Sequence, residues 1–264
     1  MKNPSITSGQ KDRISAMVVD RLIALGADNP SAQRLIGNGD LFAEKLDPII
    51  LDLAGMRYRA EEVESSYGYP AGYSPKPICN QLVLLGRDFP GLDPEPTLKA
   101  AASFHARPLP QGAEMMAVIP YYLKVAKSYN EATEMVMDLL AKKDKNFNNW
   151  LASKLGQKYT RLTESTEQAW TKIYQIQKTD YLVLPVQFGL LHRGQSTRRA
   201  REVFLKNEFG LGPYEIGVML LTHPERLVGD QNELFVDCPG AEYGPKGADG
   251  RFTGAPDFYW YGGG

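Results

Sequence analysis

The amino-acid sequence predicts an α+β protein that is rich in helices and carries a small mixed sheet of four or five short strands. Apolar residues recur at helical spacing over much of the chain, whereas apolar runs of strand length are few. The candidate strands do not alternate regularly with the helices, which argues against a doubly wound parallel sheet. Together these patterns favour the α+β class.

The N-terminal portion contains three helical patterns. Residues 11–26 carry apolar side chains at helical spacing and end on a glycine, which is well placed to terminate a helix. Asn29 and Pro30 are predicted to be the N-cap and the first position of the next helix. The third pattern, residues 40–55, contains Pro48, so we expect a break or kink at the residue before it.

A long loop or a domain boundary is predicted at residues 65–78, which hold three prolines, two glycines and three tyrosines. We therefore divide the chain into a helical N-terminal portion, residues 1–64, and a mixed α+β body, residues 79–264. A single integrated domain is an equal alternative for a chain of 264 residues.

Within the body, apolar runs predict five strands, and Pro120 places one of them at a sheet edge or a bulge. The strands are expected at residues 81–86, 117–125, 181–189, 233–238 and 258–262. Helical periodicity predicts further helices at residues 128–143, 146–156, 165–178 and 212–223. Capping boxes are expected at Ser128 with Glu131, Ser165 with Gln168, and Thr222 with Glu225.

Composition predicts a soluble cytoplasmic protein with no membrane partner. The polar N-terminus lacks the apolar core of a secretory signal, and no window approaches the ~20 apolar residues of a membrane-spanning helix. Cys79 and Cys238 form no C-x-x-C pair, which fits a reducing compartment. The net charge is −1, yet residues 121–161 carry eight Lys/Arg against four Asp/Glu. This basic middle indicates an anionic partner.

The stretch HRGQSTRRAREVF, residues 192–204, is the first candidate site. A strand running into Gly194 and then into a helix has the shape of an anion site. The candidate anion-binding residues are His192, Arg193, Ser196, Arg198, Arg199 and Arg201. The alternative is a solvated helix face, because the three helical arginines diverge and the glycines of a phosphate loop are missing.

Residues 142–161 form the second candidate site, for nucleic acid. Its cations are Lys142, Lys143, Lys145, Lys154, Lys158 and Arg161. They interleave with Phe147, Trp150 and Tyr159, and stacking aromatics on a cationic surface are typical of single-stranded nucleic acid binding. The alternative is a helix whose core face comprises Phe147, Trp150, Leu151 and Leu155, with the lysines in solvent.

The catalytic residues stay unknown, and we expect no metal and no cofactor. None of the three histidines has metal-ligand spacing, and no phosphate-loop, dinucleotide or hydrolase motif occurs. Cys238 is predicted to be an inert buried thiol. The acidic group Glu61, Glu62 and Glu64 is interpreted as solvated charge.

Aromatic segments 65–78 and 258–261 either pack on their own domain or dock on a neighbour, which would give a homo-oligomer or a larger assembly. Three functions follow as hypotheses. The first is a non-catalytic interaction protein that contacts nucleic acid or an acidic protein surface through the basic middle. The alternatives are an enzyme acting on a phosphorylated or carboxylated small molecule and a structural subunit of an assembly.

Overall fold

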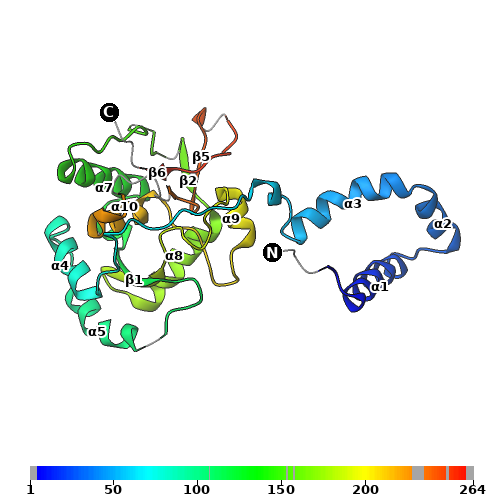
Figure 1. The fold of residues 1–264 in the computed structure, drawn as a ribbon, viewed down its shortest axis with the longest axis horizontal. Helices are drawn as coiled ribbons and strands as arrows, with labels where there is room; N and C mark the ends of the chain where they lie inside the picture. Colours follow the sequence, from blue (N-terminus) through cyan, green and yellow to red (C-terminus); the bar gives the residue numbers. More distant parts are fainter. Residues whose placement is uncertain are drawn as a thin grey trace. The chain divides into compact units, whose positions relative to one another are not determined.

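The computed structural model of the chain is drawn in Figure 1. It describes residues 5–106, 108–152, 154–156, 158–227, 235–247 and 250–259, apart from the side chain at position 105. The chain divides into two compact units, Met1–Arg57 and Tyr58–Gly264. We refer to them as unit 1 and unit 2 and describe each by itself.

Unit 1 is helical, as predicted. It contains helices α1 (Ser8–Ala24), α2 (Asn29–Gly37) and α3 (Gly39–Leu53). A reciprocal capping box between Thr7 and Gln10 starts α1, and the chain turns after it at Gly26, whose φ is +75°. The N-cap of α2 is Asp28 and not Asn29, because the Asp28 carboxylate accepts the Ser31 N–H at 2.9 Å.

The expected break at Pro48 is wrong, because α3 continues through it. A proline inside a helix removes one backbone donor, here the bond to the Glu44 carbonyl. The rest of the helix is retained, with the Phe42 N–H bonded to Asn38 and the Ala54 N–H bonded to Ile50. One lost bond is therefore tolerated within a helix of 15 residues.

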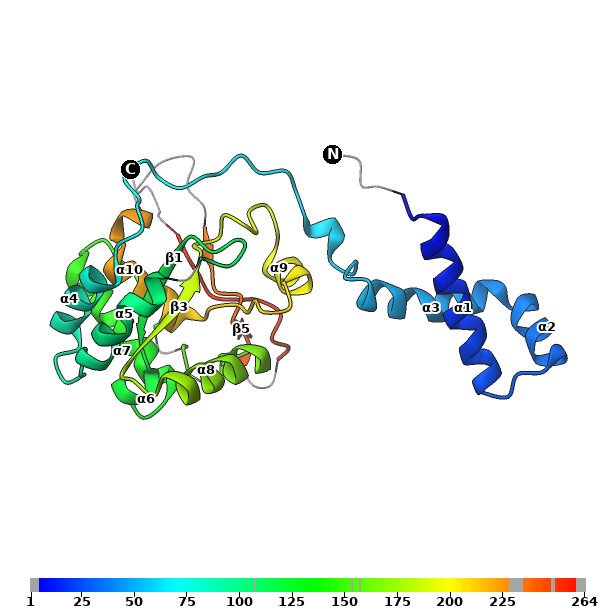
Figure 2. The ribbon, with the colours of Figure 1, turned by 90° about the horizontal axis from the view of Figure 1, so that it is seen from below.

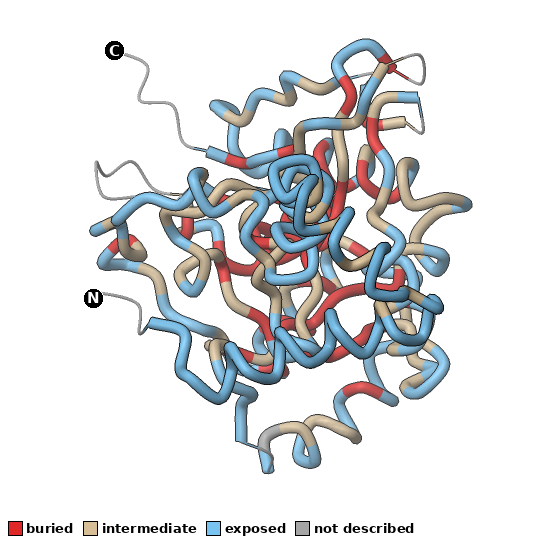
Figure 3. Tube along the Cα trace, turned by 90° about the vertical axis from the view of Figure 1, so that its right-hand side faces the viewer, coloured by how far each residue is buried: buried red, intermediate tan, exposed pale blue. Residues whose placement is uncertain are grey.

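The centre of unit 2 is an antiparallel pair of strands, β1 (Met115–Pro120) and β3 (Tyr181–Val186), with Val118 opposite Val183. Figure 2 shows helices arranged around this pair, and Figure 3 colours much of the interior as buried. Strand β3 is almost wholly buried, as predicted from its continuous apolar run. Strand β1 is also confirmed, although the predicted run ends in the short helix α6 (Tyr122–Val125).

Helices cover the β1–β3 pair. They are α4 (Ile78–Asp88), α5 (Glu95–His105), α7 (Tyr129–Lys143), α8 (Glu164–Gln177) and α10 (Pro213–Thr222). All ten residues of α10 are buried, between α7, α4 and β1. Gly217 permits this approach, since a Cβ there would lie 2.6 Å from Val136 Cγ1 of α7.

Two further strand pairs complete the unit. They are β2 (Thr160–Leu162) with β5 (Ala241–Tyr243), and β4 (Val236–Asp237) with β6 (Asp257–Phe258). A seven-residue helix α9 (Thr197–Val203) and the 3₁₀ turns η1 (Arg59–Glu61) and η2 (Pro224–Leu227) lie between these elements. The α+β class is confirmed. In detail, the described strands form three antiparallel pairs and not one mixed sheet.

Two elements predicted in the body have the wrong structure. Residues 81–86 belong to α4 and not to a strand, since Leu82 and Leu85 are buried while Val83 is 60% exposed, which is helical periodicity. The described residues of 146–156, all except residue 153, form turns and irregular chain and not a helix. There the Asn149 side chain accepts the Leu151 N–H at 3.0 Å, a local bond that competes with the helical one.

Ser128 is confirmed as the N-cap of α7, since it accepts the Glu131 N–H at 3.2 Å. The predicted capping box is incomplete there, because the Glu131 carboxylate accepts the Lys127 N–H and not the Ser128 N–H. Helix α8 is capped by Thr163, so Ser165 lies inside the first turn. Thr222 ends α10 and donates to the Met219 carbonyl, so it starts no capping box. Of the predicted strand 233–238, only residues 236–237 form β4, and of the predicted strand 258–262, only Phe258 lies in β6 among the described residues. Residues 233–234 and 260–262 lie outside the described residues.

Candidate anion-binding sites

The arginine stretch begins in a tight turn after β3. Gly194 has a φ of +76°, and a Cβ there would lie 2.2 Å from the Val63 carbonyl oxygen. The Val63 N–H donates to the Gly194 carbonyl at 2.8 Å. Ser196 then caps α9 by accepting the Arg199 N–H at 3.1 Å. The turn therefore closes directly against the backbone of the segment before residue 65.

Two arginines of α9 bind acidic side chains of that segment. The Arg198 guanidinium contacts the Glu61 carboxylate at 2.6 Å, and Glu61 also accepts the Ser196 hydroxyl. The Arg199 guanidinium contacts Glu62 at 2.9 Å and Glu202 at 2.8 Å, and only 11% of its side chain is exposed. The hydrogen bond from Arg199 lowers the pKa of Glu62. Glu61 and Glu62 thus keep contact with solvent, with 29% and 42% of their side chains exposed, but they are also paired with arginines of α9.

The other candidates in this stretch also have partners. Arg201 donates to the carbonyls of Pro239 at 2.7 Å and Ala241 at 2.6 Å, and its burial lowers its pKa. His192 lies between the Glu208 carboxylate, 2.7 Å from Nε2, and the Gln195 side chain, 2.9 Å from Nδ1. The exposed Arg193 donates to the Tyr67 carbonyl at 2.9 Å.

The side chains of the arginine stretch thus make contacts within unit 2. Its cations point in different directions, and those of α9 hold residues 58–62 and the chain leading into β5. A bound phosphate there would have to displace carboxylates and carbonyls that are already in contact. This geometry does not favour a shared anion site.

The structure separates the second basic stretch into two groups. Lys143 pairs with Asp88 of α4 at 2.5 Å, and Lys142 and Lys145 are exposed at and just beyond the end of α7. Lys154, Lys158 and Arg161 instead lie on or beside β2. The first group therefore extends toward α4, and the second belongs to the β2–β5 pair.

The β2–β5 pair adds cations that sequence spacing does not reveal. The Gly244 N–H donates to the Tyr159 carbonyl at 2.8 Å, and the stem of Lys158 lies against Gly247. Exposed Lys246 and Arg251 therefore lie in the chain that follows β5, beside the predicted cations. The signal that could have found them is weak, because these residues are about 90 positions away in the sequence and only strand pairing brings them close.

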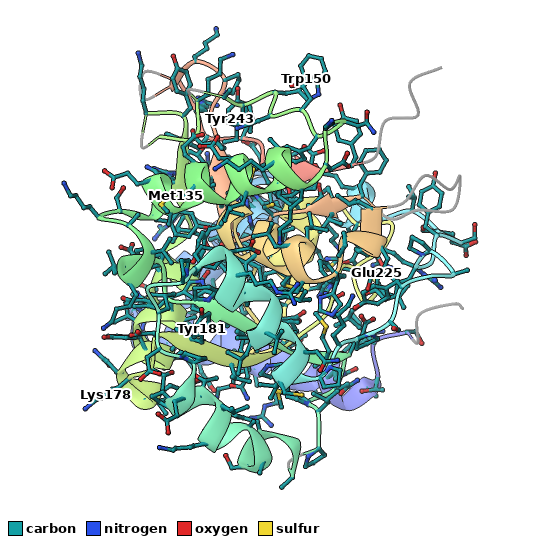
Figure 4. The ribbon with its side chains drawn as sticks, turned by 90° about the vertical axis from the view of Figure 1, so that its left-hand side faces the viewer. Met135, Trp150, Lys178, Tyr181, Glu225 and Tyr243 are labelled. Atoms are coloured by element: carbon teal, nitrogen blue, oxygen red, sulfur yellow. The ribbon has the colours of Figure 1, made fainter. Side chains whose placement is uncertain are left out.

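Aromatic rings accompany these cations. The Arg161 guanidinium lies 4.3 Å from the centre of the Phe252 ring, and Lys158 Nζ lies 5.5 Å from the Tyr159 ring. Trp150 is 73% exposed, so the predicted core face is wrong at this residue. Figure 4 shows Trp150 pointing outward at the same end of unit 2 as Tyr243 of β5. Leu155 is buried, and Phe147 and Leu151 pack against the core.

We name this surface the ribbon surface. It comprises Lys154, Lys158, Tyr159, Arg161, Lys246, Arg251 and Phe252, with Trp150 beside it. Glu242 is the one acidic residue that the structure describes across 154–161 and 241–252, and it pairs with Arg161 at 2.7 Å. Asp249 is the other acid in these segments and lies outside the described residues.

Cys238 is buried, as predicted, and this burial is the main reason why the pKa of its thiol is raised. His223 is buried as well, where it accepts the Lys76 N–H at 3.0 Å and contacts the Thr222 hydroxyl at 2.8 Å. Among the described residues, no group of three or more His, Cys, Asp or Glu side chains is placed to hold a metal ion.

A buried acid that sequence reasoning missed lies in α10. Glu215 accepts the Tyr129 hydroxyl at 2.7 Å and the Gly212 N–H at 2.9 Å. Burial raises the pKa of Glu215 to about 7, partly offset by these hydrogen bonds. Glu215 is thus a hydrogen-bonded acid within the core of unit 2.

The aromatic segments pack largely on their own unit. Tyr69 donates to the Glu114 carboxylate at 2.6 Å and accepts the Phe188 N–H at 3.0 Å, and Tyr73 stacks at a tilt on Tyr69. Phe258 is buried, while Tyr259 stacks on Phe235 with 5.3 Å between ring centres. Trp260 and Tyr261 lie outside the described residues.

Comparison with known proteins provides no relative. No protein-family model matches the chain, and neither the curated proteins nor the solved structures contain a significant match. In the part of the chain that the structure describes, no helix has the length and apolar character to cross a membrane. We therefore infer the function from the geometry of unit 2.

Proposed function

We propose that this chain is a non-catalytic interaction protein that contacts an anionic partner, single-stranded nucleic acid in the first place, through the ribbon surface. The observation that carries the proposal is the meeting of Lys154, Lys158 and Arg161, on and before β2, with Lys246 and Arg251 in the chain that follows β5. A cationic groove with stacking rings is the general design of single-strand binders.

The charges of the ribbon surface are available to a ligand in a way that those of α9 are not. The Arg161–Glu242 pair is exposed, and exposed ion pairs contribute about 0–1 kcal/mol, so a phosphate can replace Glu242 at little cost. No ion pair joins Lys154, Lys158, Lys246 or Arg251 to another described residue. Trp150 adds a free ring face, and stacking of one base is worth about 1–3 kcal/mol.

An assembly through the aromatic segments has less support, because Tyr69, Tyr73 and Phe258 pack within unit 2. An acidic protein surface is the rival partner for the ribbon surface. It would use the same cations but would have no need of the Trp150 ring. The experiment below distinguishes the two.

The test is the binding of a labelled oligo-dT to the full chain, followed by fluorescence anisotropy over a range of salt. We expect binding at low salt that weakens steeply as salt rises, with a slope of about −0.7 per phosphate contacted. The double variant Lys154→Glu/Lys158→Glu should lose at least about tenfold in affinity, since two contacts become repulsive.

The control is Lys178→Glu, which makes half of that charge change, two units against four, at the opposite end of unit 2 in Figure 4. It should leave the affinity within about twofold of the wild type. Absence of binding at low salt, or equal losses in both variants, would overturn the proposal. If polyglutamate binds as tightly as oligo-dT and Trp150→Ala changes neither, the partner is an acidic protein.

A further inference from the structure

Unit 2 contains a cavity of about 910 Å³ that the proposed function does not use. Its walls come from the end of β3, the turn at 187–195, the segment 204–211, and residues 110–113 and 235–239. All of these belong to one compact unit. Ligand cavities have volumes of about 300–1,000 Å³, so this one can enclose a small molecule.

The interior of the cavity is apolar. Buried side chains that line it include Leu184, Phe188, Leu211, Ile216 and Val236. Apolar lining with a few placed polar groups is the usual character of a small-molecule site. The apolar part of a ligand would therefore be held here by burial, and the polar groups of the wall select its charged end.

Two of the positive groups of the wall are already engaged. His192 is held between Glu208 and Gln195, and exposed Arg193 donates to the Tyr67 carbonyl. Lys206 and Glu64 are exposed, with opposite charges. These contacts leave no preformed cationic clamp for a carboxylate or a phosphate among the described lining residues.

Asp237 is the exception in the wall. The Asp237 carboxylate accepts no hydrogen bond from any residue that the structure describes. The residue opposite it in the β4–β6 register is another acid, Asp257. Arg201 is close enough to interact with Asp237 through its charge, but it donates N–H groups to the carbonyls of Pro239 and Ala241. The Asp237 side chain is exposed, so it lies at the mouth of the cavity, whereas its strand neighbour Val236 is buried in the interior.

We propose that this cavity binds a small organic cation, an amine with an apolar body, whose ammonium group pairs with Asp237. An ammonium group supplies the hydrogen-bond donors that Asp237 lacks and neutralises the repulsion from Asp257. Calcium and magnesium sites use about six oxygen ligands, more than these two carboxylates provide. An ammonium group can pair with a single carboxylate.

The test uses three probes that share one apolar body, namely 4-phenylbutylamine, 4-phenylbutanol and 4-phenylbutyrate, titrated into the full chain by calorimetry. A fragment of this size is expected to bind with a Kd of about 1 mM. The amine should bind about two- to fivefold more tightly than the alcohol, as expected for one exposed ion pair, and the carboxylate should bind most weakly.

Asp237→Asn should remove the preference for the amine and leave the affinity for the alcohol unchanged. Asp138→Asn, an exposed carboxylate on α7, is the matched control and should change neither. Ala113→Phe, which places a ring into the cavity wall, should weaken all three probes, and circular dichroism of each variant checks that it is folded. Equal binding of the probes, tighter binding of the carboxylate, saturable Ca²⁺ binding lost in Asp237→Asn, or no binding would each overturn the proposal.

Discussion

The side chain of Gln177 forms two hydrogen bonds with the backbone of Val183, donating to its carbonyl at 2.7 Å and accepting its N–H at 2.9 Å. Gln81 does the same on the other edge of the sheet, where it bonds to the Met116 carbonyl and the Val118 N–H at 2.8 and 2.9 Å. Each edge of the β1–β3 pair is thus closed by a side-chain amide.

Replacing Gln177 with Leu should therefore destabilise unit 2. The change leaves the N–H and the carbonyl of buried Val183 without these partners, at about 1–3 kcal/mol for each unsatisfied group. We expect the free energy of unfolding in urea to fall by about 2–4 kcal/mol. Gln175→Leu, an exposed position on the same helix, is the control and should change it by less than about 0.5 kcal/mol.

Stability should also depend on the protonation of Glu215. Its pKa is about 7 in the fold against 4.5 without perturbation, so the folded protein keeps a proton that the unfolded chain has released between these values. The free energy of unfolding therefore falls as pH rises through this window, by up to about 3 kcal/mol. Glu215→Gln, which keeps the bond from Tyr129, should flatten this fall in urea titrations, whereas an unchanged slope would contradict the assignment.

The arginines of α9 should fix the segment that precedes the aromatic loop. Arg199→Ala should speed hydrogen exchange at the Val63 amide, because Arg199 is 11% exposed and holds Glu62 beside it. We expect an increase of about tenfold or more, since breaking a partly buried pair costs more than breaking an exposed one. Arg198→Ala, at a side chain 47% exposed, is the comparison and should have the smaller effect.

Exposed Trp150 should report directly on a ligand of the ribbon surface. Iodide should quench its fluorescence in the free protein, and saturating oligo-dT should protect it. Trp150→Ala should weaken oligo-dT binding by about 1–3 kcal/mol, the worth of one stacked base. Trp170, which is buried, is an internal reference that neither quencher nor ligand should reach. Quenching that oligo-dT does not reduce would speak against stacking.

Gly217 and Gly86 should respond oppositely to the same change. At Gly217 a methyl group would meet Val136 Cγ1 at 2.6 Å, and overpacking costs about 1–3 kcal/mol, more than the ~1 kcal/mol gain in helix propensity. At Gly86 of α4 a Cβ meets nothing within 4 Å, so Gly86→Ala should stabilise by about 0.5–1 kcal/mol. Thermal unfolding of the two variants measures both signs.

Long periodic patterns predicted their elements correctly, and short ambiguous ones did not. The helices at α1, α7, α8 and α10 and the buried strand β3 follow from the spacing of apolar residues. The run at 81–86 is ambiguous because its four consecutive apolar residues, 82–85, fit a strand or a helix equally well. At 146–156 the apolar spacing predicts a helix, but the Asn149 side chain bonds locally to the backbone instead.

The candidate sites show a different limit. Sequence locates the arginine stretch but not its partners, because Glu61 and Glu62 are about 137 positions away in the chain. For the same reason, Lys246 and Arg251 could not be assigned to the surface of Lys158 before strand pairing was known. The cavity is built from five separate segments, so no local sequence pattern predicts it.

The two cysteines differ in a way that is useful at the bench. Cys79 is exposed on α4, whereas Cys238 is buried and has a thiol that resists ionisation. A maleimide dye added to the native wild-type chain should therefore attach at one position only, with no engineered mutation. The dye would then report on the surroundings of α4 when a ligand binds to the unmodified sequence.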